Sequence, residues 1–248
     1  MDAAEVLEVL NAAVVAVRGA LDDLDDWGPA GTRAGQYRSD LVADAAAIDV
    51  LVGAGMGVLS EESGLTHAGR DLLVVVDPVD GSTNASRGLP WFATSLCALD
   101  ADGPLAAVVV NQATGEHFAA HRGGGARRNG APAGPTRCDE LSSALVAITS
   151  SPRQPLGWRQ VRALGAVALD LCSVACGHLD AYVDCGTGNH GPWDYLGAML
   201  VCVEAGAPMV DANGLDLVTR DPGDRRAPVA AATPELLAQA LEARRRYA

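Results

Sequence analysis

Aromatic side chains are scarce in this chain, because Phe, Trp and Tyr together make up 4% of its 248 residues. Hydrophobic residues still make up 49% and charged residues 20%, close to the range of ordinary globular proteins. The composition therefore excludes a disordered chain and predicts a core of many small Ala, Val and Leu contacts. The length suits one large domain or two closely packed halves.

Positive charge is also in short supply. Lys and Arg total 18 against 31 Asp and Glu, which gives a formal net charge of -13. This balance argues against a nucleic-acid backbone or an anionic membrane as the main partner. A divalent cation is the more natural charge partner.

Long apolar runs, a basic N-terminal region and paired cysteines are absent as well. No run approaches the ~18 residues of a membrane-spanning helix, and the N-terminus lacks the basic region of a signal peptide. The six cysteines are scattered and include no Cys-x-x-Cys pair, so we expect buried thiols rather than disulfides or metal ligands. We therefore expect a soluble, cytoplasmic protein.

The spacing of apolar residues predicts helices at both ends and a strand-rich middle. It favours amphipathic helices over roughly the first twenty residues and over 41–52. Beyond residue 145, strands and helices alternate as in layered α/β proteins, so we expect one compact unit with halves 1–140 and 141–248. The expected strands are Val58–Leu59, Leu72–Val76, Ala93–Leu99, Leu105–Asn111, Glu116–Ala120, Leu145–Thr149 and Ala181–Asp184, and the later helices are Val167–Gly177, Tyr195–Ala205 and one opened by Thr233 and Pro234.

The most informative segment is Asp77–Asn84, which reads Asp-Pro-Val-Asp-Gly-Ser-Thr-Asn and directly follows the apolar run Leu72–Val76. Two carboxylates, a glycine and two hydroxyls at the end of a buried strand indicate a metal and phosphate site. Asp77 is costly to ionise there unless a cation or several donors meet it. The alternative is an Asp-Pro turn with a helix cap, which explains single features but not the whole segment.

Carboxylates elsewhere extend this pattern. Glu61 and Glu62 stand in a loop one strand upstream of Asp77, where adjacent carboxylates are often only solvated. Asp194 opens the predicted helix 195–205, where an acid can also simply complement the helix dipole. Because the segment offers no sulfur or imidazole, Mg²⁺ is the cation we expect.

These segments together resemble the inositol monophosphatase family of Mg²⁺-dependent, lithium-sensitive phosphatases. The resemblance implies an α/β fold, the layered αβαβα sandwich of sugar phosphatases, with an N-terminal α+β half, a C-terminal α/β half and the active site between them. It also implies a homodimer. The matching segments, in the family's order, are Ser60–Glu62, Asp77–Asn84, Gly123–Ala126 with Asn129–Gly130, and Trp193–Asp194 followed by Glu204–Gly206.

The resemblance implies a site for two Mg²⁺ ions and a weaker third. Glu61, Asp77 and the backbone carbonyl of Val79 would hold the first ion, and Asp77, Asp80 and Asp194 the second. Glu61 would also help to hold the third ion. Two such ions can activate a water and stabilise the leaving oxygen of an in-line displacement.

The substrate, a small phosphate ester, would lie beside these ions. Free N–H groups that follow the central strand would meet the phosphate, and the start of the helix at 167–177 would line the alcohol. The Ser82 hydroxyl, paired with a carboxylate from the second helix, would orient and help deprotonate the attacking water. The residues expected at the substrate are Gly81, Ser82, Thr83, Gly165, Ala166, Val167 and Asp194.

One departure from the family's pattern concerns the activation of water. Ala43 and Ala46 stand where the family has a threonine and an aspartate on the second helix. We therefore expect Asp44 to be the catalytic partner of Ser82, with Asp40 as the alternative one helical turn away.

A second departure concerns the alcohol. The acid that contacts inositol hydroxyls in the family would fall near Thr187, where no carboxylate stands, so recognition of inositol itself is weakly predicted. His178 is expected on an exposed helix end and His190 in a Gly-rich loop near the substrate. Arg244–Arg246 is expected to be solvated charge at a helix C-terminus.

The sequence therefore predicts a Mg²⁺-dependent phosphomonoesterase that hydrolyses a small phosphorylated alcohol such as an inositol or sugar phosphate. Histidinol-phosphate phosphatase, fructose-1,6-bisphosphatase and nucleotide 3′-phosphatase are alternatives that share the metal motif. An alternative of another class is a catalytically weak phosphate-binding or regulatory protein, motivated by the altered segment 40–46.

Overall fold

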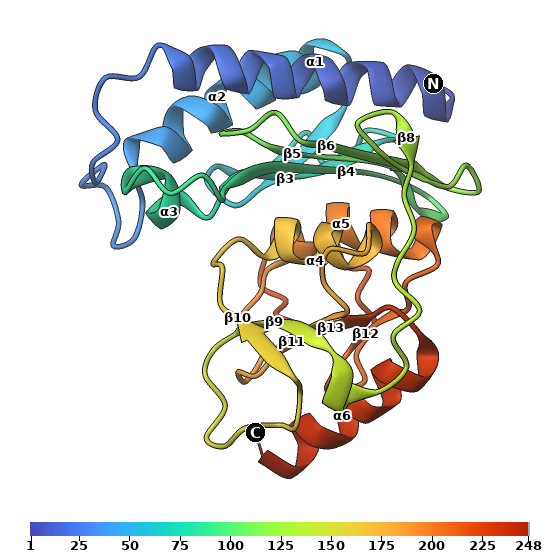
Figure 1. The fold of residues 1–248 in the computed structure, drawn as a ribbon. Helices are drawn as coiled ribbons and strands as arrows, with labels where there is room; N and C mark the ends of the chain where they lie inside the picture. The colour runs from blue at the N-terminus through green and yellow to red at the C-terminus, as the bar shows by residue number, and fades with distance from the viewer. Residues whose placement is uncertain (248) are drawn as a thin grey trace.

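Two β-sheets and three layers of helices alternate through the molecule (Figure 1). The computed structural model describes residues 1–247. In Figure 1 the layers run from helices α1 and α2 through the first sheet, helices α4 and α5, and the second sheet to helix α6. The predicted αβαβα sandwich is confirmed.

The outer helix layer consists of α1 (Ala3–Asp22) and α2 (Arg38–Gly53). The Asp2 side chain caps α1 by accepting the N–H groups of Ala4 and Glu5, each at 2.9 Å. The buried side chains of α1 recur at helical spacing and form the stripe that packs on the first sheet. They are Val6, Leu10, Ala13, Val14, Val17 and Leu21.

The first sheet has eight strands in the order β2-β1-β3-β4-β5-β6-β7-β8. Strands β1 and β3 are parallel, and the remaining neighbours are antiparallel. Helices cover both faces of β3, which explains its unbroken apolar run. The strands are β1 (Gly57–Ser60), β2 (Gly64–Thr66), β3 (Leu73–Asp80), β4 (Ala93–Asp100), β5 (Gly103–Asn111), β6 (His117–His121), β7 (Ala126–Arg128) and β8 (Ala131–Pro132).

The central helices α4 (Val167–Ala175) and α5 (Pro192–Ala205) lie between the two sheets (Figure 1). Every residue of α4 is buried, as expected for a helix that touches protein on all sides. The short helix α3 (Ser82–Ser86) follows β3 directly.

The second sheet has five strands in the order β10-β9-β11-β13-β12, and α6 (Pro234–Tyr247) covers its outer face (Figure 1). Strands β9, β10 and β11 are parallel, so their carboxyl ends share one edge of the sheet. The 3₁₀ helix η1 spans Leu141–Ser143. The strands are β9 (Leu145–Thr149), β10 (Gln160–Arg162), β11 (Ala181–Asp184), β12 (Met209–Asp211) and β13 (Pro228–Ala231).

Most predicted elements are confirmed within a few residues, but several short strands were missed. Strand β13, which pairs with both β11 and β12, was not predicted, because Pro228–Ala231 is too short and Ala-rich to show a strand pattern. The predicted helix 195–205 begins earlier, at Pro192, which occupies its first turn. The division of the chain at residue 140 stays a prediction.

The cysteines are all free thiols, as predicted, although Cys138 and Cys176 are only partly buried. No helix within residues 1–247 has the length and apolarity to cross a membrane.

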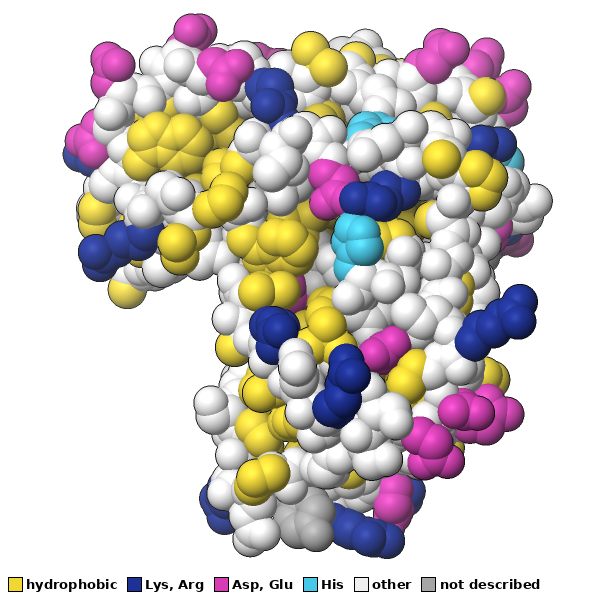
Figure 2. Space-filling model, viewed as in Figure 1, with side chains coloured by type: hydrophobic (Ala, Val, Ile, Leu, Met, Phe, Trp, Pro, Cys, Tyr) yellow, Lys and Arg dark blue, Asp and Glu magenta, His cyan; other side chains and the backbone are white. Residues whose placement is uncertain are grey.

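Acidic and basic side chains are interspersed on the face shown in Figure 2. Basic side chains stand there singly or in small groups, so this face offers no continuous basic patch to a nucleic acid. The same view shows the molecule hollowed below α3, where the N-terminal layers overhang the C-terminal ones.

The predicted glycine motif and the end of α5 form one unit. The Glu204 carboxylate accepts the N–H groups of Gly123 and Gly125, at 2.8 and 2.9 Å. Gly123 and Gly125 both have positive φ, 73° and 75°, which turns their N–H groups toward one acceptor. Two segments about eighty residues apart thus join the first sheet to the central helices.

Glu204→Ala should lower the free energy of unfolding by about 1–3 kcal/mol, because two charge-assisted hydrogen bonds are lost. Urea denaturation measures this change. Glu8→Ala, an exposed control on α1, should stay within about 0.5 kcal/mol of the original chain. Equal unfolding free energies for Glu204→Ala and the original chain would show that the contact contributes nothing.

Candidate metal and phosphate site

The parallel pairing of β1 with β3 brings two predicted metal ligands together. Ser60 pairs with Val76 in register, and the N–H of Glu61 donates to the Val76 carbonyl at 3.1 Å. Glu61 and Asp77 therefore follow neighbouring strands at the same edge of the sheet. The sequence could place each at a strand end, but not the two strands beside each other.

The Asp77–Asp80 segment is irregular, and this irregularity holds both carboxylates in place. The register between β3 and β4 shifts between Asp77 and Asp80. Within the shift, the Val79 N–H donates to Oδ1 of Asp77 at 3.1 Å, and the Thr94 hydroxyl donates to the Pro78 carbonyl at 2.8 Å. Val79 is buried in this turn, and its carbonyl remains a predicted metal ligand.

Asp194 reaches the same place from the first turn of α5. Its Oδ2 accepts the Gly191 N–H at 2.7 Å, which caps the helix. One carboxylate oxygen from each of Glu61, Asp77 and Asp194 lies within 4.8 Å of the other two. Three segments far apart in the sequence thus bring carboxylate oxygens to one point, and such oxygens suit a hard divalent cation.

Mutual repulsion marks this group of acids. Burial, together with the charge of Asp194, raises the pKa of Glu61 to about 8. Burial also raises the pKa of Asp77 and of Asp80 well above the usual range, with Glu61 adding to the first and Asp194 to the second. A divalent cation among these oxygens would favour the ionised forms.

Asp80 also joins the first sheet to the central helix α4. Its Oδ2 accepts the Ala168 N–H at 2.6 Å, and the Val167 N–H bonds to the same side chain. Ala166, at the N-cap of α4, has no side-chain cap, so Asp80 satisfies the end of this helix from the other half. The position of Asp80 is therefore fixed by a helix N-terminus as well as by its own strand.

The predicted phosphate and alcohol segments lie against each other. Gly81 has a φ of 87°, and a Cβ there would approach the Gly165 carbonyl and the Ala166 Cβ to 3.1 Å. The Asn84 amide donates to the carbonyls of Leu164 and Trp91, each at 2.8 Å. The glycine is needed both for its positive φ and for this close approach.

Thr83 and Ser82 occupy the first turn of α3. The Thr83 hydroxyl lies 3.3 Å from the Tyr37 hydroxyl at the start of α2. The N-terminal end of α2 therefore lies beside α3 and the phosphate segment.

The structure gives Asp44 another partner than the predicted Ser82. Asp44 instead accepts a hydrogen bond from the Ser60 hydroxyl, whose oxygen in turn accepts the Glu62 N–H at 3.1 Å. Asp44 lies one helical turn too far along α2 and faces β1 rather than α3. Its carboxylate supports the turn that presents Glu61.

Asp40 is the α2 carboxylate that belongs to the acidic group. It accepts the Tyr37 N–H at 2.8 Å in the first turn of α2. Burial, with a contribution from the nearby Glu62, raises the pKa of Asp40 to about 6. The charge of Asp40 in turn raises the pKa of Glu61 and Asp77. The sequence named Asp40 only as the alternative, because the residues alone do not give the rotation of α2.

Glu62 binds the loop before α2 rather than the metal group. Its carboxylate accepts the Arg33 guanidinium at 2.8 Å and also the Gln36 amide. Only 4% of the Glu62 side chain is exposed. The adjacent acids Glu61 and Glu62 therefore have different partners.

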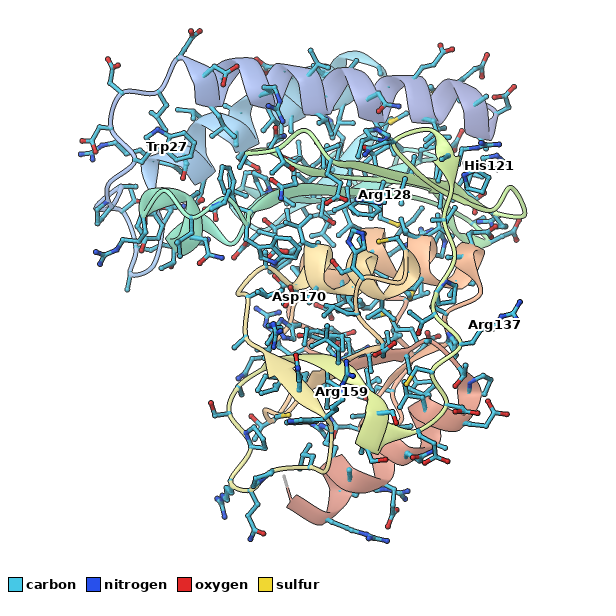
Figure 3. All side chains as sticks on the ribbon, in the orientation of Figure 1. Trp27, His121, Arg128, Arg137, Arg159 and Asp170 are labelled. Carbon is cyan, nitrogen blue, oxygen red and sulfur yellow. The ribbon has the colours of Figure 1, made fainter. Side chains whose placement is uncertain are left out.

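Asp170 in α4 is a buried acid that sequence reasoning missed (Figure 3). Its Oδ1 accepts the Trp91 indole N–H at 2.9 Å, and burial raises its pKa to about 7. This bond ties the segment after α3 to α4. An acid inside an apolar helix pattern was the available signal.

Asp184 is the second acid that was missed, at the carboxyl end of β11. It is 2% exposed and lies in the loop region where Thr187 offered no carboxylate. Arg244 of α6 donates to the carbonyls of Asp184 and Gly186, at 2.5 and 2.7 Å. The prediction that Arg244 is solvated was therefore wrong, because its long side chain reaches back under the sheet edge.

The raised pKa of Glu61 predicts that the metal-free protein loses stability as the pH rises. The carboxyl binds its proton more tightly when folded, with a pKa of about 8 against an ordinary value of 4.5. Its stabilising contribution is complete below the ordinary value and is lost as the pH rises through about 8. In EDTA, the Tm should therefore fall between about pH 5 and about pH 8.5.

Glu61→Gln should flatten this fall, and Mg²⁺ should raise the Tm at the higher pH. Glu8→Gln is the control and should keep the original slope. A Tm in EDTA that rises with pH would contradict the assignment.

Comparisons with known proteins assign the chain to a family. The model of the inositol monophosphatase family matches residues 46–247. The chain is 32% identical over 179 residues to Nus factor SuhB of Xylella fastidiosa, a match that covers 66% of this chain and 64% of that protein. It is also 32% identical over 183 residues to fructose-1,6-bisphosphatase/inositol-1-monophosphatase of Archaeoglobus fulgidus, covering 72% and 71%.

A solved structure shares the whole arrangement. It is a hypothetical protein from Pyrococcus horikoshii with similarities to inositol-1 monophosphatase, with a TM-score of 0.83 and 26% identity. The superposition covers 96% of each chain. The chain belongs to the inositol monophosphatase family.

Proposed function

We propose that the chain is a Mg²⁺-dependent phosphomonoesterase that hydrolyses a small phosphorylated alcohol. The observation that carries the proposal is the meeting of Glu61, Asp77 and Asp194 within 4.8 Å of one another. Asp80 and the Gly81 turn lie directly beside this group. Buried acids that repel one another next to a glycine turn are a costly arrangement unless cations and a phosphate bind there.

The residues present fit two or three Mg²⁺ ions, because the donors are carboxylate and carbonyl oxygens. Glu61, Asp77 and the Val79 carbonyl would hold one ion, and Asp77, Asp80 and Asp194 another, with Glu61 also near a weaker third. When bound, such ions activate water and neutralise the charge on the transferred phosphoryl group.

The chain's own residues would orient the substrate and the water. The N–H groups of Gly81, Ser82 and Thr83 would bind phosphate oxygens at the start of α3. The Ser82 hydroxyl would orient the attacking water. Asp40 replaces Asp44 as the proposed acceptor for the proton, because its carboxylate lies among the acidic group.

The alcohol part of the substrate would lie against Gly165, Ala166 and Val167, which contact the phosphate segment through Gly81. Several relatives are named inositol monophosphatase or fructose-1,6-bisphosphatase. Inositol monophosphate and fructose 1,6-bisphosphate are therefore the first substrates to test on this chain. Histidinol phosphate and a nucleotide 3′-phosphate are the further substrates to test. A cytoplasmic location and a homodimer stay predictions.

A regulatory role without efficient hydrolysis is the second candidate. Relatives from two organisms carry the name Nus factor SuhB, and this name is the reason to test a regulatory role beside hydrolysis. Tight Mg²⁺-dependent binding of phosphate esters without release of phosphate across the panel would support this candidate and contradict the first.

Asp80→Asn should lower kcat/KM for phosphate release by about a hundredfold or more, because one cation loses a charged ligand. A Mg²⁺-containing panel of phosphomonoesters measures this change. Asp49→Asn, an exposed control on α2, should keep its rate within about twofold. Undiminished turnover by Asp80→Asn would contradict the metal assignment.

Asp40 and Asp44 can be separated by matched substitutions. Asp40→Asn should lower kcat by about 10²–10⁴-fold if it accepts the proton. Asp44→Asn should chiefly lower the Tm, because it loses the bond from Ser60, and should lower kcat by less than about tenfold. The reverse order of the two kcat values would restore Asp44 as the proposed proton acceptor.

A further inference from the structure

His190 lies between two acids in the loop that joins β11 to α5. Its side chain is 11% exposed, and both ring nitrogens face oxygen atoms. Nδ1 lies 3.4 Å from Oδ2 of Asp194, and Nε2 lies 3.3 Å from the Tyr182 hydroxyl and 3.6 Å from Oδ2 of Asp184. The imidazole therefore connects a predicted metal ligand to a deeper carboxylate.

The surroundings hold the ring in one orientation. The His190 N–H and carbonyl exchange hydrogen bonds with Arg226, at 3.2 and 2.9 Å. Tyr182 is fully buried, and its hydroxyl donates to the Thr149 hydroxyl at 2.8 Å. The Tyr182 oxygen thus remains an acceptor for the Nε2 proton of His190.

Asp184 supplies negative charge behind the ring. Its Oδ1 accepts the Gly186 N–H at 2.7 Å, whereas its buried Oδ2 has no hydrogen-bond partner among residues 1–247. A buried carboxylate oxygen without a partner is costly. His190 is the group that faces this oxygen, and Arg244 fixes the backbone beneath it.

On the other side of the imidazole ring, two contacts fix the orientation of the Asp194 carboxylate. Its Oδ2 accepts the Gly191 N–H at 2.7 Å and faces His190. Both contacts are made to Oδ2, so they fix the orientation of the Asp194 carboxylate. Groups that bond to a metal ligand orient it, and their loss typically costs about 10–100-fold in metal affinity or activity.

We propose that His190 is a positioning residue that orients Asp194 toward the metal site, and that Asp184 and Tyr182 hold the imidazole from behind. The line of contacts runs from the end of β11 to the first turn of α5. This proposal rests on the proposed function, because it takes Asp194 to be a metal ligand.

The test is the binding of Mn²⁺ to the metal-free full chain, measured by electron paramagnetic resonance. His190→Ala should raise the Mn²⁺ dissociation constant by about 10–100-fold. His190→Asn should restore part of the affinity, because its amide can donate to Asp194. Asp184→Asn should weaken binding in the same direction. His178→Ala, on an exposed histidine, is the matched control and should bind as the original chain does.

Phosphate release gives a second reading. His190→Ala should raise the Mg²⁺ concentration for half-maximal rate by about tenfold or more, while the KM for the phosphate ester changes less. If His190 only stabilised the fold, His190→Ala would lower the Tm and the amount of active protein. The Mg²⁺ concentration for half-maximal rate would then not rise relative to the KM for the phosphate ester.

The outcomes separate this proposal from the proposed function. Unchanged Mn²⁺ affinity in His190→Ala and Asp184→Asn, in a chain that binds Mn²⁺ and releases phosphate, overturns the positioning role alone. Equal losses in His190→Ala and His190→Asn also overturn it. If the original chain binds no Mn²⁺, both proposals fail. If His190→Ala does not fold, the Asp184→Asn and His190→Asn affinities decide.

Discussion

Repulsion among buried carboxylates is the constraint on which the arrangement of this protein depends. Glu61 follows β1, Asp77 and Asp80 lie at the end of β3, and Asp194 opens α5. Burial and the charges of the neighbouring acids raise the pKa of Glu61, Asp77 and Asp80. No hydrophobic contact favours such a grouping. Backbone pairing, helix caps and a β-bulge hold these acids together.

The same residues explain how the two halves are joined. Asp80 caps α4 across the boundary between the halves, and the Asp170 carboxylate of α4 accepts the Trp91 indole from the first half. Gly81 lies against the Gly165 carbonyl because Gly81 has no side chain to keep the two segments apart. The proposed site residues therefore also form the contact between the first sheet and the central helices. A change in the packing of α4 or α5 would move the proposed metal ligands.

The layered fold and the members of the acidic group could be predicted from the sequence, because apolar runs end at acidic and glycine-rich motifs. The choice between Asp40 and Asp44 could not, since it depends on the rotation of α2 against β1 and α3. Asp184 was missed because its role depends on a contact with His190. An irregular loop brings His190 next to Asp184, and the sequence pattern does not show the path of that loop. Arg244 resembles a solvated residue in the sequence, because its burial arises only from the packing of α6 against the second sheet. Local patterns give element types, whereas these contacts arise from packing between elements.

The central claim is that the acids form a cation site beside a phosphate-binding turn. The most direct measurement is anomalous X-ray scattering from crystals of the full chain soaked with Mn²⁺ and inorganic phosphate. The account predicts Mn²⁺ peaks among the carboxylates of Glu61, Asp77, Asp80 and Asp194, with phosphate between them and the Gly81 turn. Mn²⁺ peaks only elsewhere on the protein, with these four carboxylates bare, would contradict it.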